Sequence, residues 1–417
     1  MRPNRCLGAL IVSARAGIVL FHVVNLVVVF QRFGPYHAAR VNALSAAGVR
    51  VTAVEVCSAD ATYAWDPLKP FVCDRVALVE GAGSVTFSEL CGRMSAALDA
   101  CRADIVAIPG WSSQGAMAAL ISARRAGIPA ILMSDSTAHD ESRVWLREVV
   151  KRRVVRLFSS ALVGGLAHVE YATALGMARE RIFTGYDVVD NEHFARGAAQ
   201  AQGWANAARD ELNVPERYFL ASNRFIEKKN LSRLLQGFSK YRARAGHGAW
   251  DLVLLGDGGL RAQLERQVME LGLHDAVHMP GFKQYNELPK YYGLASAFVH
   301  ASTTEQWGLV VNEAMACGLP VIISNRCGCA PELVEEGANG YTFDPLDVDS
   351  LVELMLKMAG GDSDRAAMGA ASRRIISEWT PQTFSENLLA AAEVALAVPR
   401  SKSTPLDSGL LRLLAWR

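Results

Sequence analysis

The sequence predicts an α/β fold with two successive domains, each built on a parallel sheet. Three observations support this. Apolar runs alternate with helical patterns from residue 25 to about residue 190, as they do when strands are buried on both faces of a sheet. Residues 195–213 lose the strand pattern and are rich in Ala, Gly and Gln, and the alternation restarts at residue 218. We therefore expect domains at residues 25–195 and 214–395, joined by a linker at residues 196–213.

Each domain contains several short apolar runs separated by helical patterns. In the first domain we expect strands at residues 26–30, 50–56, 75–80, 104–109, 129–134, 160–163 and 181–184, with helices at 35–47, 87–101, 115–126, 143–157 and 166–175. In the second we expect strands at 218–221, 251–255, 276–279, 297–300 and 320–323, with helices at 231–245, 260–271, 287–294 and 309–317. A central cleft between two such sheets is the expected ligand site.

The composition excludes some classes of function. With 43 Lys and Arg against 42 Asp and Glu, the formal charge is +1, which argues against a dedicated nucleic-acid binder. The eight cysteines include no CxxC pair, so a zinc site is disfavoured and a reducing cytoplasm is favoured. The expected partner is a small molecule.

Both ends of the chain lie outside the two predicted domains. Residues 7–30 are largely apolar, but Arg15 lies near the middle and residues 25–30 are needed as the first strand. We therefore interpret residues 1–24 as an N-terminal extension that is appended or lies on a surface, with a membrane span or a signal peptide as less favoured readings. Residues 396–417 are expected to form a loop-like tail whose apolar end packs on the protein body, with peripheral membrane contact as the alternative.

Two carboxylates flank the start of the helix expected at 309–317. Glu305 lies in the polar loop before Gly308, and Glu313 lies about one and a half turns inside the helix. Because that helix is apolar on nearly every side, we expect Glu313 to be buried and to need a partner. Taken singly, each acid is better explained by a structural role.

Basic residues follow the first strand of the second domain. Arg224 and Lys229 lie where a parallel sheet binds anionic groups, although a solvated turn explains them too. After the next strand, Gly256 and Gly258 could bring the backbone close to a ligand, or simply form a tight turn.

In the first domain, Gly34 and His139 each follow a predicted strand and are expected to face the cleft. His139 could serve as an acid or base, or belong to a capping cluster with Asp140. The basic stretch at 151–156 is typical of a solvated helix face, with contact to anionic lipid or acceptor as the alternative. The acidic triplets at 347–349 and 362–364 are better explained as helix caps than as a metal site.

In combination these motifs resemble the GT-B glycosyltransferases of family 4. The resemblance covers roughly residues 215–345 and rests on Glu305 and Glu313, on Arg224 with Lys229, on 256–258 and on Pro-Gly-Phe at 280–282. It implies two Rossmann-like domains, a nucleotide-sugar donor bound mainly by the second, and sugar transfer with retention of configuration, without a metal or other cofactor.

The resemblance also implies roles for individual residues. Glu313 would bind the ribose hydroxyls, and Glu305 the hydroxyls of the donor sugar. Arg224 and Lys229 would neutralise the leaving diphosphate. The other residues that it assigns to donor binding are Gly308, Leu309 and Val310 through their backbone N–H groups, Phe282 and Lys283 near the base, and Gly256.

The first domain resembles the family less closely. Family members often have a glycine pair where this chain has Gly34 followed by Pro35, and His139 resembles a polar residue of the reaction centre. We expect a cytoplasmic retaining glycosyltransferase, with a carbohydrate or lipid-linked acceptor and peripheral membrane contact as an option. The alternatives are a GT-B sugar-nucleotide epimerase and a catalytically silent relative that binds a nucleotide sugar.

Overall fold

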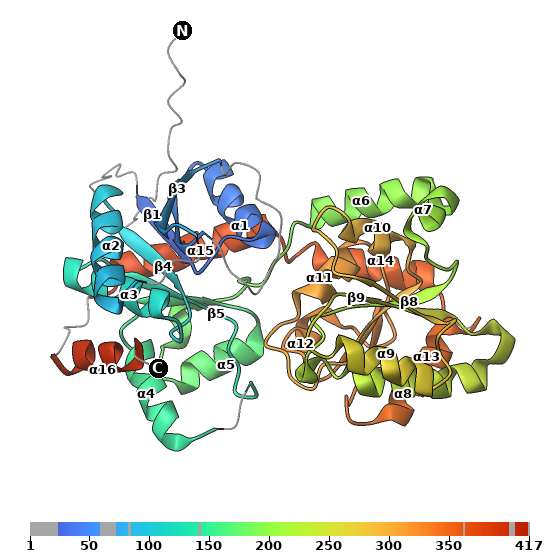
Figure 1. The fold of residues 1–417 in the computed structure, drawn as a ribbon. Coiled ribbons are helices and arrows are strands. Elements are labelled where there is room, and N and C mark those ends of the chain that lie inside the picture. Colours follow the sequence, from blue (N-terminus) through green and yellow to red (C-terminus); the bar gives the residue numbers. More distant parts are fainter. Residues whose placement is uncertain are drawn as a thin grey trace, which may run out of the picture. The chain divides into compact units, whose positions relative to one another are not determined.

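The computed structural model describes residues 24–58, 72–81, 85–140, 143–361, 363–399 and 405–415. The chain divides into two compact units: unit 1 contains Met1–Val188 together with Pro381–Arg417, and unit 2 contains Val189–Thr380. Each unit has a parallel sheet with helices on both faces (Figure 1). The predicted fold class, with two Rossmann-like parallel sheets, is confirmed.

Unit 1 is built on a seven-stranded sheet in the order β3-β2-β1-β4-β5-β6-β7, with every pairing parallel. Its strands are β1 (Asn25–Phe30), β2 (Arg50–Cys57), β3 (Asp74–Val79), β4 (Ile105–Pro109), β5 (Ala130–Ser134), β6 (Ser160–Val163) and β7 (Ile182–Phe183). The strands are short and apolar because both faces are covered: residues 26–30 of β1 are all buried.

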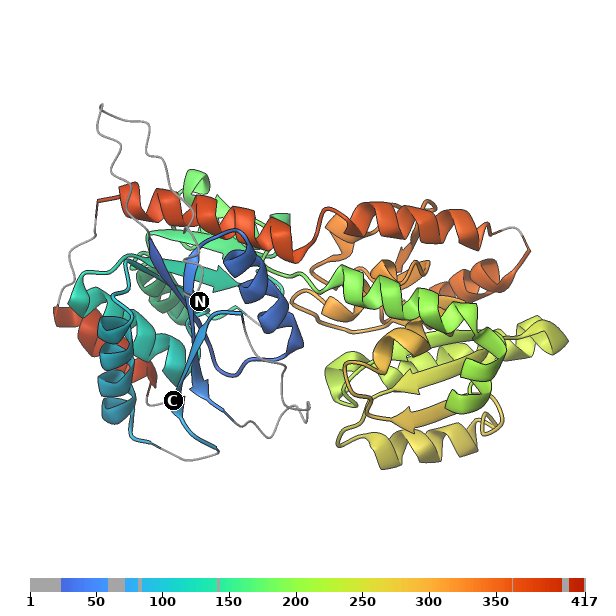
Figure 2. The ribbon, with the colours of Figure 1, turned by 90° about the horizontal axis from the view of Figure 1, so that it is seen from above.

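The helices of unit 1 lie on the two faces of this sheet. They are α1 (Pro35–Ala46), α2 (Phe87–Ala100), α3 (Gln114–Ala126), α4 (Trp145–Val155), α5 (Leu166–Ala174), α15 (Pro381–Ala397) and α16 (Pro405–Ala415), with a short 3-10 helix at Arg179–Arg181. Helices α1 and α15 pack together on one face, and α2 and α3 lie on the other (Figure 2). Helix α2 begins at a capping box in which Thr86 accepts from the Glu89 N–H and the Glu89 carboxylate accepts from the Thr86 N–H.

Unit 2 is built on a six-stranded sheet in the order β10-β9-β8-β11-β12-β13, also parallel throughout. Its strands are β8 (Tyr218–Ser222), β9 (Asp251–Leu255), β10 (Val277–Gly281), β11 (Ala297–His300), β12 (Val321–Ser324) and β13 (Gly340–Phe343). Strand β13 was not anticipated from the sequence, and it forms the edge beside β12.

The helices of unit 2 also form two layers. They are α6 (Asn191–Gly203), α7 (Ala205–Leu212), α8 (Leu231–Ala245), α9 (Arg261–Glu270), α10 (Leu288–Leu294), α11 (Leu309–Ala316), α12 (Ala330–Leu333), α13 (Val348–Ala359) and α14 (Arg365–Ile376), with 3-10 turns at Glu227–Lys229 and Gly246–Gly248. Helices α8, α9 and α13 cover one face, whereas α6, α10, α11 and α14 cover the other (Figure 1).

The segment that we predicted to be a linker is helical. Residues 196–212 fall in α6 and α7 except for Trp204 between them, and α6 packs tightly against α10. A Cβ atom added to Gly293 of α10 would lie 2.6 Å from the Ala198 Cα of α6, so the two backbones are nearly in contact. The small residues that suggested a linker are the residues that allow this close helix packing.

The second domain does not extend to residue 395 as predicted. Helix α15 belongs to unit 1, where Ser160 Oγ donates to the Ala391 backbone oxygen over 2.7 Å. The tail is not a loop either, because residues 405–415 form α16. Its Leu411 is buried and Asp407 lies 2.8 Å from the Arg153 Nε, so this end of the chain packs on unit 1.

The structure also bears on the N-terminal segment and on the two acidic triplets. The segment at 1–24 lies outside the described residues except for its last residue. Among the residues that the structure describes, no helix is both long and apolar enough to cross a membrane. Asp347 and Asp364 cap α13 and α14 by accepting from the backbone N–H groups of Ser350 and Ala367, which confirms the capping interpretation.

We predict that Gly293→Ala destabilises unit 2 by about 1–3 kcal/mol, because the added methyl group must push α10 away from α6. The control is Gly203→Ala at the end of α6, where a Cβ atom meets nothing within 4 Å. That change should leave stability unchanged or raise it by up to about 1 kcal/mol. Urea unfolding of the two variants measures the difference, and equal midpoints would contradict the packing argument.

Candidate functional site

The sheet of unit 2 has a topological switch point between β8 and β11. From β8 the chain continues to β9 and β10 on one side, and from β11 it continues to β12 and β13 on the other. The loops that leave the carboxyl ends of two such strands diverge, and ligands of open α/β sheets bind there. Arg224 and Lys229 follow β8 and Glu305 follows β11, so the loops that carry these predicted residues adjoin at this point.

Glu305 is the centre of a cluster of charged and polar side chains. Its carboxylate forms an ion pair with Lys229, and its Oε1 lies 3.4 Å from the Lys228 Nζ. Ser302 Oγ donates to Glu305 Oε2 over 3.3 Å. Burial alone would raise the pKa of Glu305, but the hydrogen bond with His300 and the charges of the two lysines hold it well below its usual range. The carboxylate is therefore ionised.

His300, at the carboxyl end of β11, is a member of this cluster that the sequence analysis missed. It is fully buried, and its Nε2 lies 3.1 Å from Ser302 Oγ and 3.5 Å from Glu305 Oε2. Burial lowers the pKa of His300, so the ring is neutral. Its Nδ1 has no partner among the described residues, which assigns the proton to Nε2, from where it is donated toward Ser302 and Glu305. The sequence did contain a signal for His300, because it is the one polar residue of the apolar strand β11.

The start of α11 lies next to Glu305. Gly308 precedes the helix with φ of 106°, a conformation that favours glycine, and a Cβ atom there would lie 3.4 Å from Glu305 Cγ. The backbone N–H groups of Leu309 and Val310 are in the first turn, where a helix provides no acceptor of its own. The three predicted backbone donors therefore adjoin the predicted sugar-binding carboxylate.

Glu313 is buried within α11, as the apolar surroundings of that helix predicted. The partner that it was expected to need is Tyr292 of α10, whose hydroxyl donates to Glu313 Oε2 over 2.6 Å. Tyr292 is itself held by an edge-to-face contact with Phe194, whose ring centroid is 5.9 Å away. A fixed, fully buried carboxylate is thus one helix turn and a half from the loop that carries Glu305.

The two glycines after β9 have a structural explanation. A Cβ atom on Gly256 would lie 1.8 Å from the Asn223 backbone oxygen, and one on Gly258 would lie 2.9 Å from the Phe225 backbone nitrogen. The close approach is therefore to the segment around Arg224 and not to open space. Gly256 thereby positions the loop that carries Arg224, whatever else it contacts. The Asn223 amide between these segments is buried and neither of its polar atoms has a partner in the described part of the chain.

Phe282 and Lys283 follow β10, which is three strands away in the sheet from β11, the strand that precedes Glu305. The Phe282 side chain is exposed, and the Lys283 Nζ lies 5.5 Å from the centroid of the Tyr291 ring. They lie at the same carboxyl edge of the sheet as Arg224 and Lys229, because all six strands run parallel.

Gly34 and His139 belong to unit 1, at the carboxyl edge of its own sheet. The Gly34 N–H donates to His37 Nδ1 over 2.9 Å; burial and the nearby Arg40 lower the pKa of His37 to about 3, so this ring is a neutral acceptor. The His139 side chain is exposed, and its backbone N–H donates to Thr137 in a turn that Asp140 also caps. Asp140 therefore caps this turn but does not start the next helix, which begins at Trp145 after Val144, and a catalytic role for His139 stays a prediction.

The same edge of unit 1 contains a buried acid that the sequence did not indicate. Asp187 lies 3.9 Å from Arg40, whose guanidinium donates to the Val188 backbone oxygen over 3.0 and 3.2 Å. Burial and the nearby Asp135 raise the pKa of Asp187 from 3.8 to about 8, against the opposing charge of Arg40. The carboxyl group is thus protonated at neutral pH.

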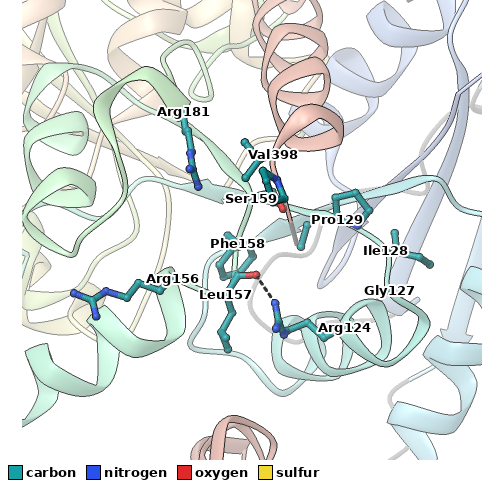
Figure 3. Close-up of a pocket in the computed structure, with 12 residues that line it drawn as sticks. Arg124, Gly127, Ile128, Pro129, Arg156, Leu157, Phe158, Ser159, Arg181 and Val398 are labelled. Carbon is teal, nitrogen blue, oxygen red and sulfur yellow. Dashed lines mark hydrogen bonds between the residues drawn. The ribbon is translucent and has the colours of Figure 1, made fainter. Parts of the chain in front are cut away.

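A cavity of about 200 Å³ in unit 1 lies at the opposite edge of the sheet. It is lined by residues just before β5 and β6, and Arg124 donates there to the Leu157 backbone oxygen over 3.2 Å (Figure 3). Arg156 also lines it, but its guanidinium extends away from the strand ends (Figure 3). This cavity is separate from the carboxyl edge that contains Gly34 and His139.

Comparison with known proteins identifies the class of protein. Residues 204–375 match the family model of group 1 glycosyl transferases. The chain is 31% identical to the amylovoran biosynthesis glycosyltransferase AmsK of Erwinia amylovora over 171 residues, which are 40% of this chain and 41% of that protein. It is 28% identical over 297 residues to a GDP-mannose-dependent alpha-(1-6)-phosphatidylinositol monomannoside mannosyltransferase of Mycolicibacterium smegmatis, covering 67% and 74% of the two chains.

Solved structures of low sequence identity share the whole fold. Anabaena Alr3699/HepE, crystallised with UDP and glucose, superposes with a TM-score of 0.69 at 18% identity, over 89% of this chain and 99% of its own. Sucrose-phosphate synthase from Thermosynechococcus elongatus gives a TM-score of 0.68 at 18% identity, over 90% and 99%. The chain is thus an enzyme of the glycosyltransferase class with the GT-B fold.

We predict that Asp187→Asn changes how stability depends on pH. A raised folded-state pKa means that the protonated carboxyl stabilises the fold; this contribution is complete below pH 3.8 and is lost as the pH rises through about 8. The wild type should therefore lose more stability than the variant between pH 4 and pH 8. Urea unfolding at both pH values measures this, and parallel losses would show that Asp187 ionises as freely in the folded chain as in the unfolded one.

Proposed function

We propose that this protein is a retaining glycosyltransferase that takes its sugar from a nucleotide-sugar donor bound by unit 2. The observation that carries the proposal is the cluster at the switch point, where the partly buried Glu305 meets Lys228 and Lys229 beside the first turn of α11. The hydroxyls of a sugar need acceptors and a diphosphate needs cations, and the loops after β11 and β8 bring both together at this site.

Each predicted residue has a role in this proposal. Glu305 accepts from hydroxyls of the donor sugar, and Glu313 accepts from those of the ribose. The N–H groups at Gly308, Leu309 and Val310 donate to the sugar and to phosphate oxygens. Phe282, Lys283 and Gly256 belong to the loops on the side of the base.

The reaction breaks the bond between the anomeric carbon and the diphosphate and forms a bond from that carbon to an acceptor oxygen on the same face. Negative charge develops on the diphosphate as it leaves. Arg224 and Lys229 stabilise that charge, and because Lys229 also pairs with Glu305, the donor phosphates must share this cation with the carboxylate. The proposal therefore assigns the stabilising charge to side chains and calls on no metal or other cofactor.

The donor base and the acceptor are proposed only as classes. The similar structures include complexes with UDP and with UDP-glucose, and the similar sequences include GDP-mannose-dependent enzymes, so both bases are candidates. The names of the relatives include amylovoran and O-antigen synthesis and a phosphatidylinositol mannoside. These names support a carbohydrate or lipid-linked acceptor in the synthesis of a cell-surface glycan. We propose that unit 1 binds this acceptor and that transfer takes place at the cytoplasmic side of a membrane. His139 is the proposed acid or base for the acceptor hydroxyl.

Incubation with radiolabelled nucleotide sugars, with and without a lipid extract as acceptor, tests this proposal. Transfer to acceptor, or slow donor hydrolysis without one, supports a glycosyltransferase. Conversion of the donor to an isomeric nucleotide sugar would identify an epimerase, and saturable binding without turnover would identify a silent relative. The anomeric configuration of the product, read by NMR, tests retention.

We predict that Lys229→Ala lowers turnover at least tenfold, because the leaving diphosphate loses a cation worth about 1.4 kcal/mol or more. Lys240→Ala is the control, since Lys240 also pairs with a carboxylate, Asp349, but on the exposed surface of α8. Initial rates at saturating donor measure the effect. Equal rates in the Lys229 and Lys240 variants would remove Lys229 from the mechanism.

We also predict that Glu313→Gln weakens donor binding by about tenfold, since an amide is a poorer acceptor for two ribose hydroxyls than a carboxylate. Tyr292→Phe leaves Glu313 in place but removes the hydrogen bond that orients it, and a smaller loss is expected. Calorimetric titration with the nucleoside diphosphate measures both. Unchanged affinity in a folded Glu313→Gln protein would leave Glu313 with a structural role alone.

A further inference from the structure

Helix α4 of unit 1 exposes large apolar side chains at its amino-terminal end. Trp145 is 75% exposed and Leu146 57% exposed, and Val144 and Val149 beside them are about half exposed. These four residues, the α4 apolar cluster, lie within six positions of the chain. A group of exposed apolar side chains at one helix end is typical of an interaction site.

The same helix is strongly basic on its exposed surface. Its exposed arginines are Arg147, Arg152 and Arg153, with Arg156 at the C-cap. The acid of this helix, Glu148, faces inward and bonds to Lys151 and Tyr171, so it does not neutralise the exposed arginines. Arg152 and Arg156 have no polar side-chain partner within the part of the chain that the structure describes.

The apolar cluster lies toward the edge of the unit 1 sheet that contains Gly34 and His139. The chain enters α4 after the carboxyl end of β5 and leaves it for the start of β6, so Trp145 is at the carboxyl side and Arg156 at the opposite side. Helix α16 lies beside α4 (Figure 1), joined by the contact of Asp407 with Arg153. It adds one more apolar side chain, Leu413, which is largely exposed.

We infer that the α4 apolar cluster and the arginines of α4 form a surface that binds a bilayer containing anionic phospholipids. Tryptophan and leucine gain free energy at the boundary of headgroups and acyl chains, and arginines that extend along the same helix meet the lipid phosphates. Each basic residue near such a surface adds a further electrostatic attraction to the anionic headgroups.

The charge of α4 favours an anionic bilayer over a second copy of the chain as the partner. A symmetric contact through α4 would bring the same arginines of both copies together, with Glu148 already engaged inside each unit. A bilayer with acidic headgroups instead offers an apolar interior to the Trp and Leu side chains and negative charge to the arginines. The inference concerns binding to lipid and does not depend on the proposed transfer reaction.

Sedimentation of the full chain with lipid vesicles tests the inference. Vesicles of phosphatidylcholine mixed with phosphatidylglycerol should bind the protein, vesicles of phosphatidylcholine alone should bind it weakly, and added salt should release it. Replacing Trp145 and Leu146 with Ser should lower the partition coefficient at least tenfold. Arg152→Gln with Arg156→Gln should lower it by about fivefold per arginine.

Matched controls lie in unit 2. Trp204, between α6 and α7, is exposed to the same degree as Trp145, and Arg266 of α9 is an exposed arginine without a side-chain partner among the described residues. Trp204→Ser and Arg266→Gln should leave vesicle binding unchanged, and unfolding midpoints check that all variants fold.

Several results would overturn the inference. These are equal binding of neutral and anionic vesicles, equal losses in the unit 2 controls, or a concentration-dependent dimer that the α4 substitutions dissolve without changing lipid binding. Donor hydrolysis measured without vesicles should be the same in wild type and in the α4 variants. A protein that binds vesicles but transfers no sugar would therefore contradict the proposed function and leave this inference standing.

Discussion

The ion pairs between one partly buried carboxylate, Glu305, and two lysines are the interaction on which the geometry of unit 2 depends. Glu305 can be partly buried after β11 because Lys228 and Lys229, which follow β8, pair with its carboxylate. The neutral His300 also contacts this carboxylate through its Nε2. The same pairing ties the two diverging loops of the switch point together. Thr303 reinforces this link, since its N–H donates to the Lys228 backbone oxygen over 2.8 Å.

The loop around Glu305 is also held from its other side. The Glu305 N–H donates to the Arg326 backbone oxygen, and the Gly328 N–H donates back to the Glu305 oxygen over 2.9 Å. The segments after β8, β11 and β12 are thus joined through one residue. A side chain fixed in this way loses little freedom when it meets a ligand, which is the property that a hydroxyl-binding acid requires.

The sequence was informative wherever a local pattern determines structure. Alternating apolar runs located most of the strands, and the apolar surroundings of Glu313 correctly required that it be buried with a partner. The identity of the partner could not be predicted, because Tyr292 is 21 residues away and is brought there by the packing of α10. His300 and the orphaned amide of Asn223 were missed for the same reason: only the folded sheet shows which polar side chains share the switch point. Composition led to a wrong prediction in two places. The small residues of α6 were interpreted as a linker but allow close helix packing, and α15 was assigned to the second domain although it packs on unit 1.

The position of α15 has a consequence for synthesis on the ribosome. Unit 2 is one uninterrupted segment, whereas unit 1 needs residues near both ends of the chain. Ser160 of β6 and Thr184 both bond to α15, which is translated about two hundred residues later. The face of the unit 1 sheet that α15 covers together with α1 is therefore incomplete until the second half has been translated. The unit that begins first is completed last, and its apolar sheet is the part of the nascent chain most in need of protection from aggregation.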